Sequence, residues 1–175
     1  MTLYGTIRRI FVPCDDKILW LPFILRTFFK IRGKYDLQFI FATFPPSANL
    51  LCAWAIHLIS GLPLILDYRD RWNGNFQFQE GRPQIQCWLD NLIEKKILKK
   101  CSGILFNSPG IMDQYLSDFS FLKKIPHQCI LNGFDPDDYL IQQMDTDHDK
   151  KLKLVISGSA KGTVSPINLI RTLCR

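Results

Sequence analysis

The chain has 175 residues, of which 47% are hydrophobic, so it is long enough to bury one full-sized core and to begin a second. Its 22 basic and 16 acidic residues give a formal net charge of +6, which favours anionic surfaces or ligands. The basic residues are scattered and no nucleic-acid-binding motif is legible, so nucleic acid is a poor candidate for the partner.

The first predicted elements are a strand at residues 7–12 and a helix at residues 17–30. The helix has an apolar surface too wide for one that faces solvent, so it must pack on the sheet or touch a lipid interface, where Trp20 would lie beside Arg26. Residues 1–30 lack the pattern of a secretory signal peptide. We therefore expect a cytoplasmic protein, with peripheral attachment at the inner face of a membrane as an option.

The segment at residues 37–66 contains no Asp, Glu, Lys or Arg, and a membrane span would show the same absence of charge. Prolines and Gly61 divide it instead into a strand at residues 37–41, a helix at residues 47–60 and a strand at residues 63–66. Each piece has the length of an element in a globular protein.

The most informative motif is the string Asp67-Tyr68-Arg69-Asp70-Arg71-Trp72, which directly follows the strand at residues 63–66. In open parallel sheets, ligands bind beyond the carboxyl ends of the strands. Carboxylates and a guanidinium there can bind the hydroxyls of a sugar or the phosphates of a lipid or nucleotide. The alternative is an Asp/Arg pair that only braces the loop.

A helix is predicted at residues 84–100, with polar residues such as Asp90 and Glu94 facing outward. Four lysines crowd its last turns, where they complement the helix dipole or contact anionic lipid headgroups. The apolar residues that share one face are Ile85, Trp88, Leu89, Leu92, Ile93 and Ile97, and the lysines are Lys95, Lys96, Lys99 and Lys100.

Two further strands are predicted at residues 103–107 and 127–131, with a helix at residues 109–119 between them. The second strand leads into Asn132-Gly133-Phe134-Asp135, in which Asp135 can cap a short helix. These elements complete a first domain that we place at residues 1–144.

Strand and helix alternate throughout this domain, and Ser47 and Ser108 are predicted to cap the helices that follow them. Alternation of this kind predicts an α/β fold with a Rossmann-like, mostly parallel sheet and helices on both faces.

Residues 145–151 are polar and are expected to form a linker to a second domain that starts at residues 152–175. A loop with Gly158, Ser159 and Lys161 follows its first strand and could hold phosphate through backbone amides. The spacing is not that of a Walker motif, so a plain connector is the alternative.

The six cysteines include no C-x-x-C pair, and the three histidines show no ligand spacing with each other or with cysteine. We therefore expect the cysteines to act as small apolar residues and expect no metal site.

Three segments carry a further pattern: Asp36 to Pro46, Gly61 to Trp72 with its D-x-R-D-x-W string, and Ile130 to Asp135 with N-G-F-D. Together they resemble the amino-terminal half of family 4 glycosyltransferases of the GT-B architecture, over most of residues 7–140. The resemblance implies two Rossmann-like domains facing across a cleft, the first binding mainly the acceptor and the second the nucleotide-sugar donor. It implies no metal and no cofactor beyond a nucleoside diphosphate sugar as co-substrate.

The reaction so implied is transfer of a sugar to a glycan or lipid-linked acceptor, in which stabilisation of the departing diphosphate would be a major contribution. No residue is identified as a general base. The candidates for the acceptor-side cleft are Asp67, Arg69, Asp70, Trp72, Thr43 and Ser108. The candidates for the interdomain and donor side are Asn132, Gly133, Asp135, Gly158, Ser159 and Lys161.

The chain departs from the family pattern at both ends, because the usual first strand and glycine-rich loop are not found before Thr6 and only about one strand-helix unit of the donor domain follows the linker. We therefore expect the polypeptide to be inactive alone. The alternative function is a non-catalytic binding module that docks on an anionic membrane surface or a partner subunit. A nicotinamide-dependent oxidoreductase is disfavoured, since no G-x-G-x-x-G follows a predicted strand.

Overall fold

The computed structural model describes residues 16–74 and 83–138. The chain divides into two compact units, Met1–Gly133 and Phe134–Arg175. The predictions that lie outside the described residues are the strand at 7–12, the domain boundary at 144, the linker at 145–151 and the second domain at 152–175.

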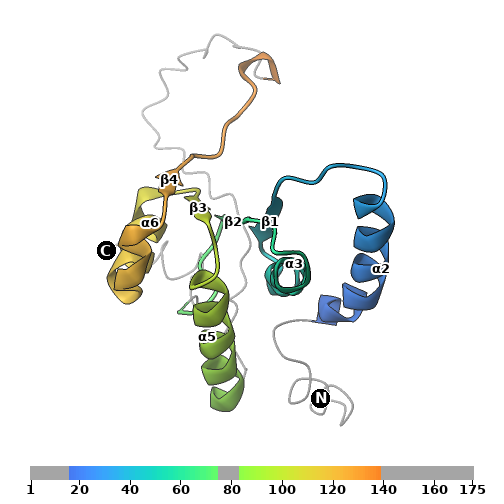
Figure 1. Cartoon of the computed structure of the whole chain (residues 1–175). Helices are drawn as coiled ribbons and strands as arrows, with labels where there is room; N and C mark the ends of the chain where they lie inside the picture. The colour runs from blue at the N-terminus through green and yellow to red at the C-terminus, as the bar shows by residue number, and fades with distance from the viewer. Residues whose placement is uncertain (1–15, 75–82, 139–175) are drawn as a thin grey trace, which may run out of the picture. The chain divides into compact units, whose positions relative to one another are not determined.

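The described chain begins with the 3-10 helix η1, Asp16–Trp20, and continues into the helix α2, Leu21–Arg32 (Figure 1). A proline lies in the first turn of α2, where its missing N–H would have had no partner in any case. The helix predicted in this region is therefore confirmed, with a separate 3-10 turn at its start. Within α2, only Phe28 is buried, and both η1 and α2 contact the helix α3, Ser47–Ser60.

A four-stranded parallel sheet forms the centre of the first unit, and its strands lie side by side in chain order. They alternate with α3 and two further helices, which confirms the predicted α/β, Rossmann-like fold. The strands are β1 Ile40–Phe44, β2 Leu64–Tyr68, β3 Gly103–Phe106 and β4 His127–Cys129. The two helices are α5 Gln84–Leu98 and α6 Pro109–Asp118, and the 3-10 helix η2, Ser120–Lys124, follows α6.

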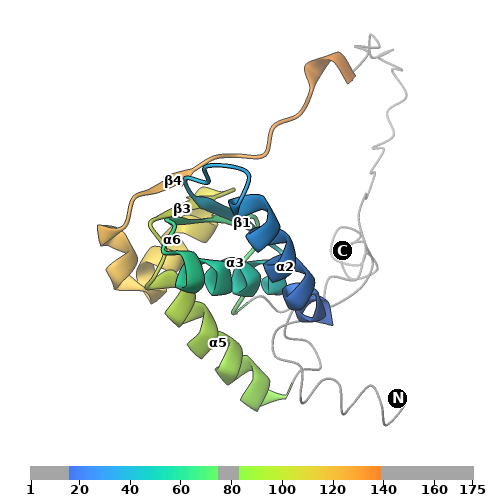
Figure 2. The same cartoon turned by 45° about the vertical axis from the view of Figure 1, so that its right-hand side comes forward.

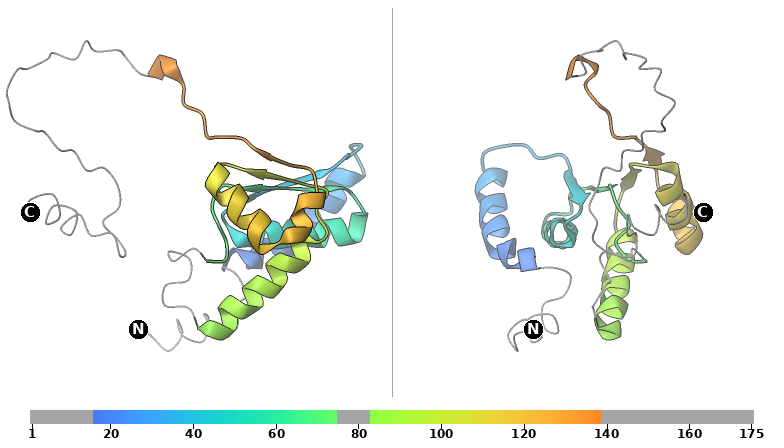
Figure 3. Two further views of the ribbon diagram at one scale, coloured as in Figure 1. Left: turned by 90° about the vertical axis from the view of Figure 1, so that its left-hand side faces the viewer. Right: turned by 180° about the vertical axis from the view of Figure 1, so that it is seen from behind.

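The strand order determines which face of the sheet the connecting helices cover. Each connection moves one strand further in the same direction, and right-handed crossovers that all move in one direction lie on the same face of a sheet. The left view of Figure 3 shows α3, α5 and α6 below the strands, and Figure 2 shows the same arrangement. We expected helices on both faces of the sheet. Within the described ranges, α3, α5 and α6 all cover the same face. On the other face Phe41 is 52% exposed.

The core lies between this covered face and the three helices. Ala42 pairs in register with Leu66, and Phe44 pairs with Tyr68, so alternate residues of neighbouring strands point into the same layer. The fully buried residues of this layer are contributed by strands, helices and the η2 turn alike. They include Leu50, Leu64, Leu66, Tyr68, Ile97, Leu98, Ile104, Phe106 and Leu122.

Aromatic rings fill the carboxyl-end half of the core. The Tyr68 ring lies 4.7 Å from that of Tyr115 and 6.2 Å from that of Phe106, centroid to centroid. Trp72 stacks on Phe44 with centroids 5.8 Å apart and planes 18° apart. Because Trp72 is only 2% exposed, the chain after β2 turns back into the core at this residue.

Three of the predicted signals for helix ends concern α3 and α6, and two of these are confirmed. Gly61 ends α3 in the left-handed conformation, with φ 72°, which a residue without a Cβ adopts at little cost. Ser108 caps α6, because its Oγ accepts a hydrogen bond of 3.3 Å from the backbone N–H of Ile111. The prediction for Ser47 is wrong: Pro46 holds the N-cap position without a side-chain hydrogen bond, and Ser47 is the first helical residue.

Helix α5 is rotated away from the predicted orientation as far as Glu94. Asp90 and Glu94 are each 1% exposed, so the prediction that they face outward is wrong. Apolar contact with the core is concentrated at the carboxyl end of the helix, where Ile97 and Leu98 are fully buried. The residues with exposed apolar side chains are Ile85, Trp88, Leu89 and Leu92.

Among the helices in the described part of the chain, none has both the length and the apolar character that a membrane crossing requires.

The two tryptophans Trp72 and Trp88 provide a test of this packing. Trp72→Ala removes a buried ring and its stacking contact with Phe44, so we expect the free energy of unfolding to fall by about 3–5 kcal/mol. Trp88→Ala removes a ring that is 57% exposed, so we expect a change within about 0.5 kcal/mol. Urea unfolding of both variants checks this, and equal losses would contradict the outward orientation of Trp88.

Candidate functional site

The carboxyl end of β2 carries the charged string, and its first residue lies within the strand. Asp67 pairs in register with Thr43 on β1 and with Leu105 on β3. Since its neighbours Leu66 and Tyr68 point into the core, Asp67 points to the face without described helices. Its side chain is 13% exposed, so a partly desolvated carboxylate lies at the edge of an otherwise apolar sheet.

Arg69 is the partner of this carboxylate. Its Nε lies 3.3 Å from Oδ2 of Asp67, and its side chain is 58% exposed. The backbone N–H of Arg69 donates to the carbonyl of Phe44, so the sheet ladder holds the residue at its base while the guanidinium extends into solvent. The pair leaves further donors of the guanidinium available to another molecule.

A pocket of about 410 Å³ surrounds this pair at the carboxyl edge of the sheet. It joins three parts of the chain that are far apart in sequence: the end of β2, the residue that follows β3, and the segment after β4. Its lining residues are Phe41, Asp67, Arg69, Leu105, Asn107, Ile130, Leu131, Asn132 and Gly133.

Asn107 lies at the wall of this pocket. Its backbone N–H donates to the carbonyl of Tyr68 at 3.1 Å, which fixes the residue at the edge of the sheet. Its Oδ1 is enclosed and has no hydrogen-bond donor within the described ranges. The pocket therefore combines a carboxylate acceptor, a guanidinium donor and carboxamide groups above an apolar floor.

The other acceptor-side candidates take different positions. Trp72 lies in the core and Ser108 caps α6, so both side chains are used in the fold. The carbonyl of Thr43 accepts from the Asn49 side chain at 3.3 Å, and Thr43 is not among the residues that line the pocket. Asp70 is exposed and lines neither of the two pockets described here.

Of the interdomain candidates, Asn132 and Gly133 line the same pocket as Asp67. Asp135 belongs to the second unit, where its Oδ1 accepts from the backbone N–H of Asp137 at 3.0 Å and caps the 3-10 helix η3, Pro136–Asp138. This confirms the predicted capping role of Asp135. The remaining donor-side candidates, Gly158, Ser159 and Lys161, lie outside the described residues.

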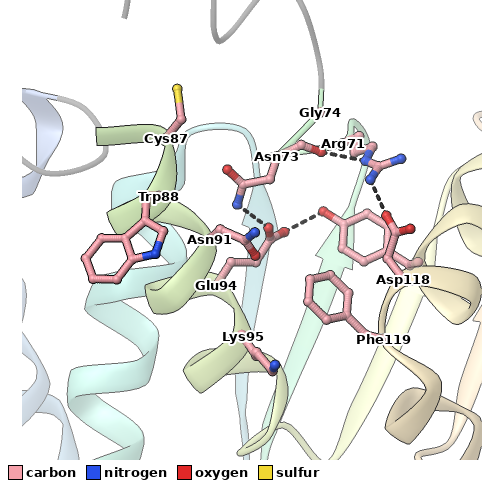
Figure 4. A pocket seen from close by; sticks show the side chains of 11 residues that line it. Arg71, Asn73, Gly74, Cys87, Trp88, Asn91, Glu94, Lys95, Asp118 and Phe119 are labelled. Carbon is pink, nitrogen blue, oxygen red and sulfur yellow. Dashed lines mark hydrogen bonds and ion pairs between the residues drawn. The ribbon is translucent and has the colours of Figure 1, made fainter. Parts of the chain in front are cut away.

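A buried carboxylate lies beneath the charged string, on the helix side of the sheet (Figure 4). Glu94 of α5 accepts a hydrogen bond of 2.5 Å from the hydroxyl of Tyr115 and another of 2.5 Å from the side-chain amide of Asn73. The Tyr115 hydroxyl in turn accepts from the backbone N–H of Trp72 at 3.2 Å. Glu94 therefore connects α5 and α6 to the loop that follows β2.

Arg71 makes a second connection from the same loop to α6. Its guanidinium forms an ion pair with Asp118 and donates to the side chain of Gln114 at 2.9 Å, and its Nε donates to the carbonyl of Asn73 at 2.5 Å. Of the two arginines in the string, Arg71 thus braces the loop, whereas Arg69 faces the carboxyl-edge pocket.

A second pocket, of about 500 Å³, adjoins these braces. Figure 4 shows that the Trp88 ring at its border is directed away from the Glu94 carboxylate. The residues that line it are Arg71, Asn73, Gly74, Cys87, Trp88, Asn91, Glu94, Lys95, Tyr115, Asp118 and Phe119.

Burial controls the ionisation of this cluster. Desolvation raises the pKa of Glu94, although the hydrogen bonds from Tyr115 and Asn73 act in the opposite direction. The pKa values of Tyr115 and Tyr68 lie well above 10.0, first because both rings are buried and then because the Glu94 charge is close. Both tyrosines are therefore neutral hydrogen-bonding groups at physiological pH.

Sequence reasoning missed the Glu94 cluster. A signal was present, because Gln86, Asp90 and Glu94 form a row at intervals of four that continues into Ile97, and this whole row is buried. The apolar row on the other side of the helix gave the stronger pattern. The partners of Glu94 lie 21 residues away, so nothing local indicated that they exist.

In the residues that the structure describes, no group of three or more His, Cys, Asp or Glu side chains could hold a metal ion. Comparisons of the sequence with protein-family models and with curated proteins, and of the structure with solved structures, gave no match.

Glu94→Gln tests the charge in the buried cluster. Because the pKa of Glu94 is raised in the folded state, the folded chain holds this proton more tightly than the unfolded chain, so stability is lost as the pH rises above 4.5. The loss is at most about 1.4 kcal/mol per pH unit. Glutamine keeps an acceptor for Tyr115, cannot ionise, and should remove this pH dependence.

The measurement is the free energy of unfolding in urea from pH 4.5 to about pH 8 for wild type, Glu94→Gln and the exposed control Asp113→Asn. We expect the wild type to lose stability relative to Glu94→Gln as the pH rises, and Asp113→Asn, which keeps Glu94, to lose stability relative to Glu94→Gln in the same direction. A constant difference between wild type and Glu94→Gln would contradict a raised pKa for Glu94.

Proposed function

We propose that the first unit of this chain is the acceptor-side domain of a glycosyltransferase of the GT-B architecture, and that its carboxyl-edge pocket binds the saccharide of a glycan or lipid-linked acceptor. The observation that carries the proposal is the meeting of Asp67 and Arg69 with Asn132 in one pocket. These residues come from the two motifs, D-x-R-D-x-W and N-G-F-D, on which the resemblance depends most, and Asn132 lies 63 positions after Arg69 in the sequence.

The chemistry of the pocket suits a sugar. Each sugar hydroxyl both donates and accepts a hydrogen bond. The pocket offers the Asp67 carboxylate, which accepts, the Arg69 guanidinium, which donates, and the carboxamides of Asn107 and Asn132, which contain both a donor and an acceptor. Phe41 and the aliphatic residues supply apolar surface for the C–H face of a pyranose ring. A volume of about 410 Å³ is within the range of small-ligand pockets.

Asp67 has the most specific proposed role. Its carboxylate is partly buried, so a hydrogen bond from an acceptor hydroxyl would form in a medium of low dielectric, where it is stronger than in water. Arg69 lies beside it and can orient the same hydroxyl or a neighbouring phosphate through its free donors. Transfer would use a nucleoside diphosphate sugar as donor, which we assign to the second domain of the architecture and to the loop with Gly158, Ser159 and Lys161.

Asp67→Asn tests this assignment with little change in side-chain shape. Hydrogen bonds to charged groups contribute about 1.5–3 kcal/mol, so we expect the substitution to weaken acceptor binding about 10- to 100-fold. The measurement is isothermal titration of the purified chain with a panel of oligosaccharides and short-chain polyprenyl diphosphate sugars. Arg69→Ala should weaken binding as well, and most for the ligands that carry phosphate.

Asp113→Asn, on the exposed side of α6, is the matched control and should bind like wild type. Two outcomes would contradict the proposal. One is that no member of the panel binds the wild-type chain, and the other is that a member binds wild type and Asp67→Asn with equal affinity.

A further inference from the structure

The outward face of α5 forms a continuous strip with two chemically different halves. Its members recur at intervals of three and four residues, which places them on one side of a helix. This outer strip consists of Ile85, Trp88, Leu89, Leu92, Lys95 and Lys96 of α5 together with its C-cap residue Lys99, and it is apolar toward the start of the helix and cationic toward its end.

The strip is exposed because the opposite side of the helix is held by specific bonds. Glu94 is tied to Asn73 and Tyr115, and Ile97 and Leu98 are fully buried, so the rotation of α5 about its axis is fixed. Trp88 and Ile85 are left 57% exposed, with Leu92 at 39%. An apolar row of this length on a solvent-facing helix is typical of an interaction surface.

The charges on α5 indicate the kind of partner. Both carboxylates of the helix, Asp90 and Glu94, lie on its buried side, so no acidic side chain of α5 shares the strip with its lysines. The chain as a whole carries a formal charge of +6. A surface that is anionic on the outside and apolar beneath would complement both halves of the strip, and a bilayer with acidic headgroups has this structure.

We propose that the outer strip of α5 docks on an anionic lipid surface. Trp88 and the aliphatic residues enter the interface between headgroups and acyl chains, where tryptophan is favoured, and Lys96 and Lys99 contact headgroup phosphates. The assignment rests on α5 alone and does not depend on the saccharide pocket. Lipid binding and acceptor binding can therefore succeed or fail separately.

Vesicle flotation tests the electrostatic half of the proposal. Wild type should float with vesicles of phosphatidylcholine and phosphatidylglycerol far better than with phosphatidylcholine alone, and less well as salt is raised. Lys96→Glu/Lys99→Glu should lower the partition coefficient on the anionic vesicles about 30-fold or more. Lys30→Glu/Lys34→Glu, in the last turn of α2 and just after it, makes the same change in net charge on another element and should lower the partition coefficient only about threefold or less.

Quenching of tryptophan fluorescence by brominated lipid tests the apolar half. Trp88 and Trp20 are matched, at 57% and 56% exposed, on different elements. Trp88→Phe should abolish most of the quenching on anionic vesicles, and Trp20→Phe should keep most of it. Trp88→Ala should also weaken flotation roughly tenfold with no change in charge.

Circular dichroism of each variant shows whether it is folded, and Trp88→Ala at the surface provides a variant expected to fold in any case. The proposal is overturned if the two lysine pairs have equal effects on flotation, or if quenching is unchanged in Trp88→Phe. It is also overturned if wild type fails to bind anionic vesicles while sedimentation shows self-association that Trp88→Ala removes, since the strip would then dock on a second copy of the chain.

Discussion

The direction of the crossovers determines how this domain is built. Four parallel strands that follow one another in space as in sequence require three right-handed connections that lie on the same face. Within the described ranges, one face of the sheet therefore carries the aromatic and aliphatic core. The residues that alternate with the core, Asp67 among them, are displayed on the other face, so polar chemistry reaches the carboxyl edge without disturbing the packing.

The loop after β2 contributes residues to both faces of the sheet, and buried hydrogen bonds hold it in this path. Its start, with Asp67 and Arg69, belongs to the carboxyl-edge pocket, while Trp72 returns to the core. The turn between these two parts of the loop is held on the helix side of the sheet by the hydrogen bond from Asn73 to Glu94 and by the ion pair of Arg71 with Asp118. A buried carboxylate is costly unless its oxygens accept hydrogen bonds, and here both do. The same bonds set the rotation of α5, which connects the geometry of the pocket to the exposure of the outer strip.

Much of the fold could be predicted from sequence because its signals are local. The strands β1, β2 and β3 showed as short apolar runs, although β1, at Ile40–Phe44, begins three residues later than the strand predicted at residues 37–41. Gly61 marked a helix end, and the Ser108-Pro109 pair marked a helix start. The rotation of α5 could not be predicted in this way. Its apolar row and its row of Gln86, Asp90 and Glu94 are both regular, and the choice between them is made by Tyr115 and Asn73, which periodicity does not detect.

The candidate site residues also divide into those that local sequence signals could predict and those that depend on distant contacts. Asp67, Arg69 and Asn132 could be proposed because strand ends and a motif mark them, and the structure brings them together. Trp72 and Ser108 resemble site residues in sequence, yet their side chains are committed to core packing and capping, which depends on the path of the chain after each strand. Arg69 and Arg71 are alike in type and lie two positions apart, and only their three-dimensional partners separate a pocket residue from a brace.

We propose above that an acceptor saccharide lies against the carboxyl ends of β2 and β4. Amide chemical-shift mapping of the isotope-labelled chain during titration with a lipid-linked or free oligosaccharide measures this most directly. If the saccharide binds in the carboxyl-edge pocket, the largest shifts should fall at Asp67, Arg69, Asn107 and Asn132, with little change along α5. Shifts that centre instead on Asn73, Asn91 and Tyr115, beside the second pocket, or the absence of any shift across the panel, would contradict it.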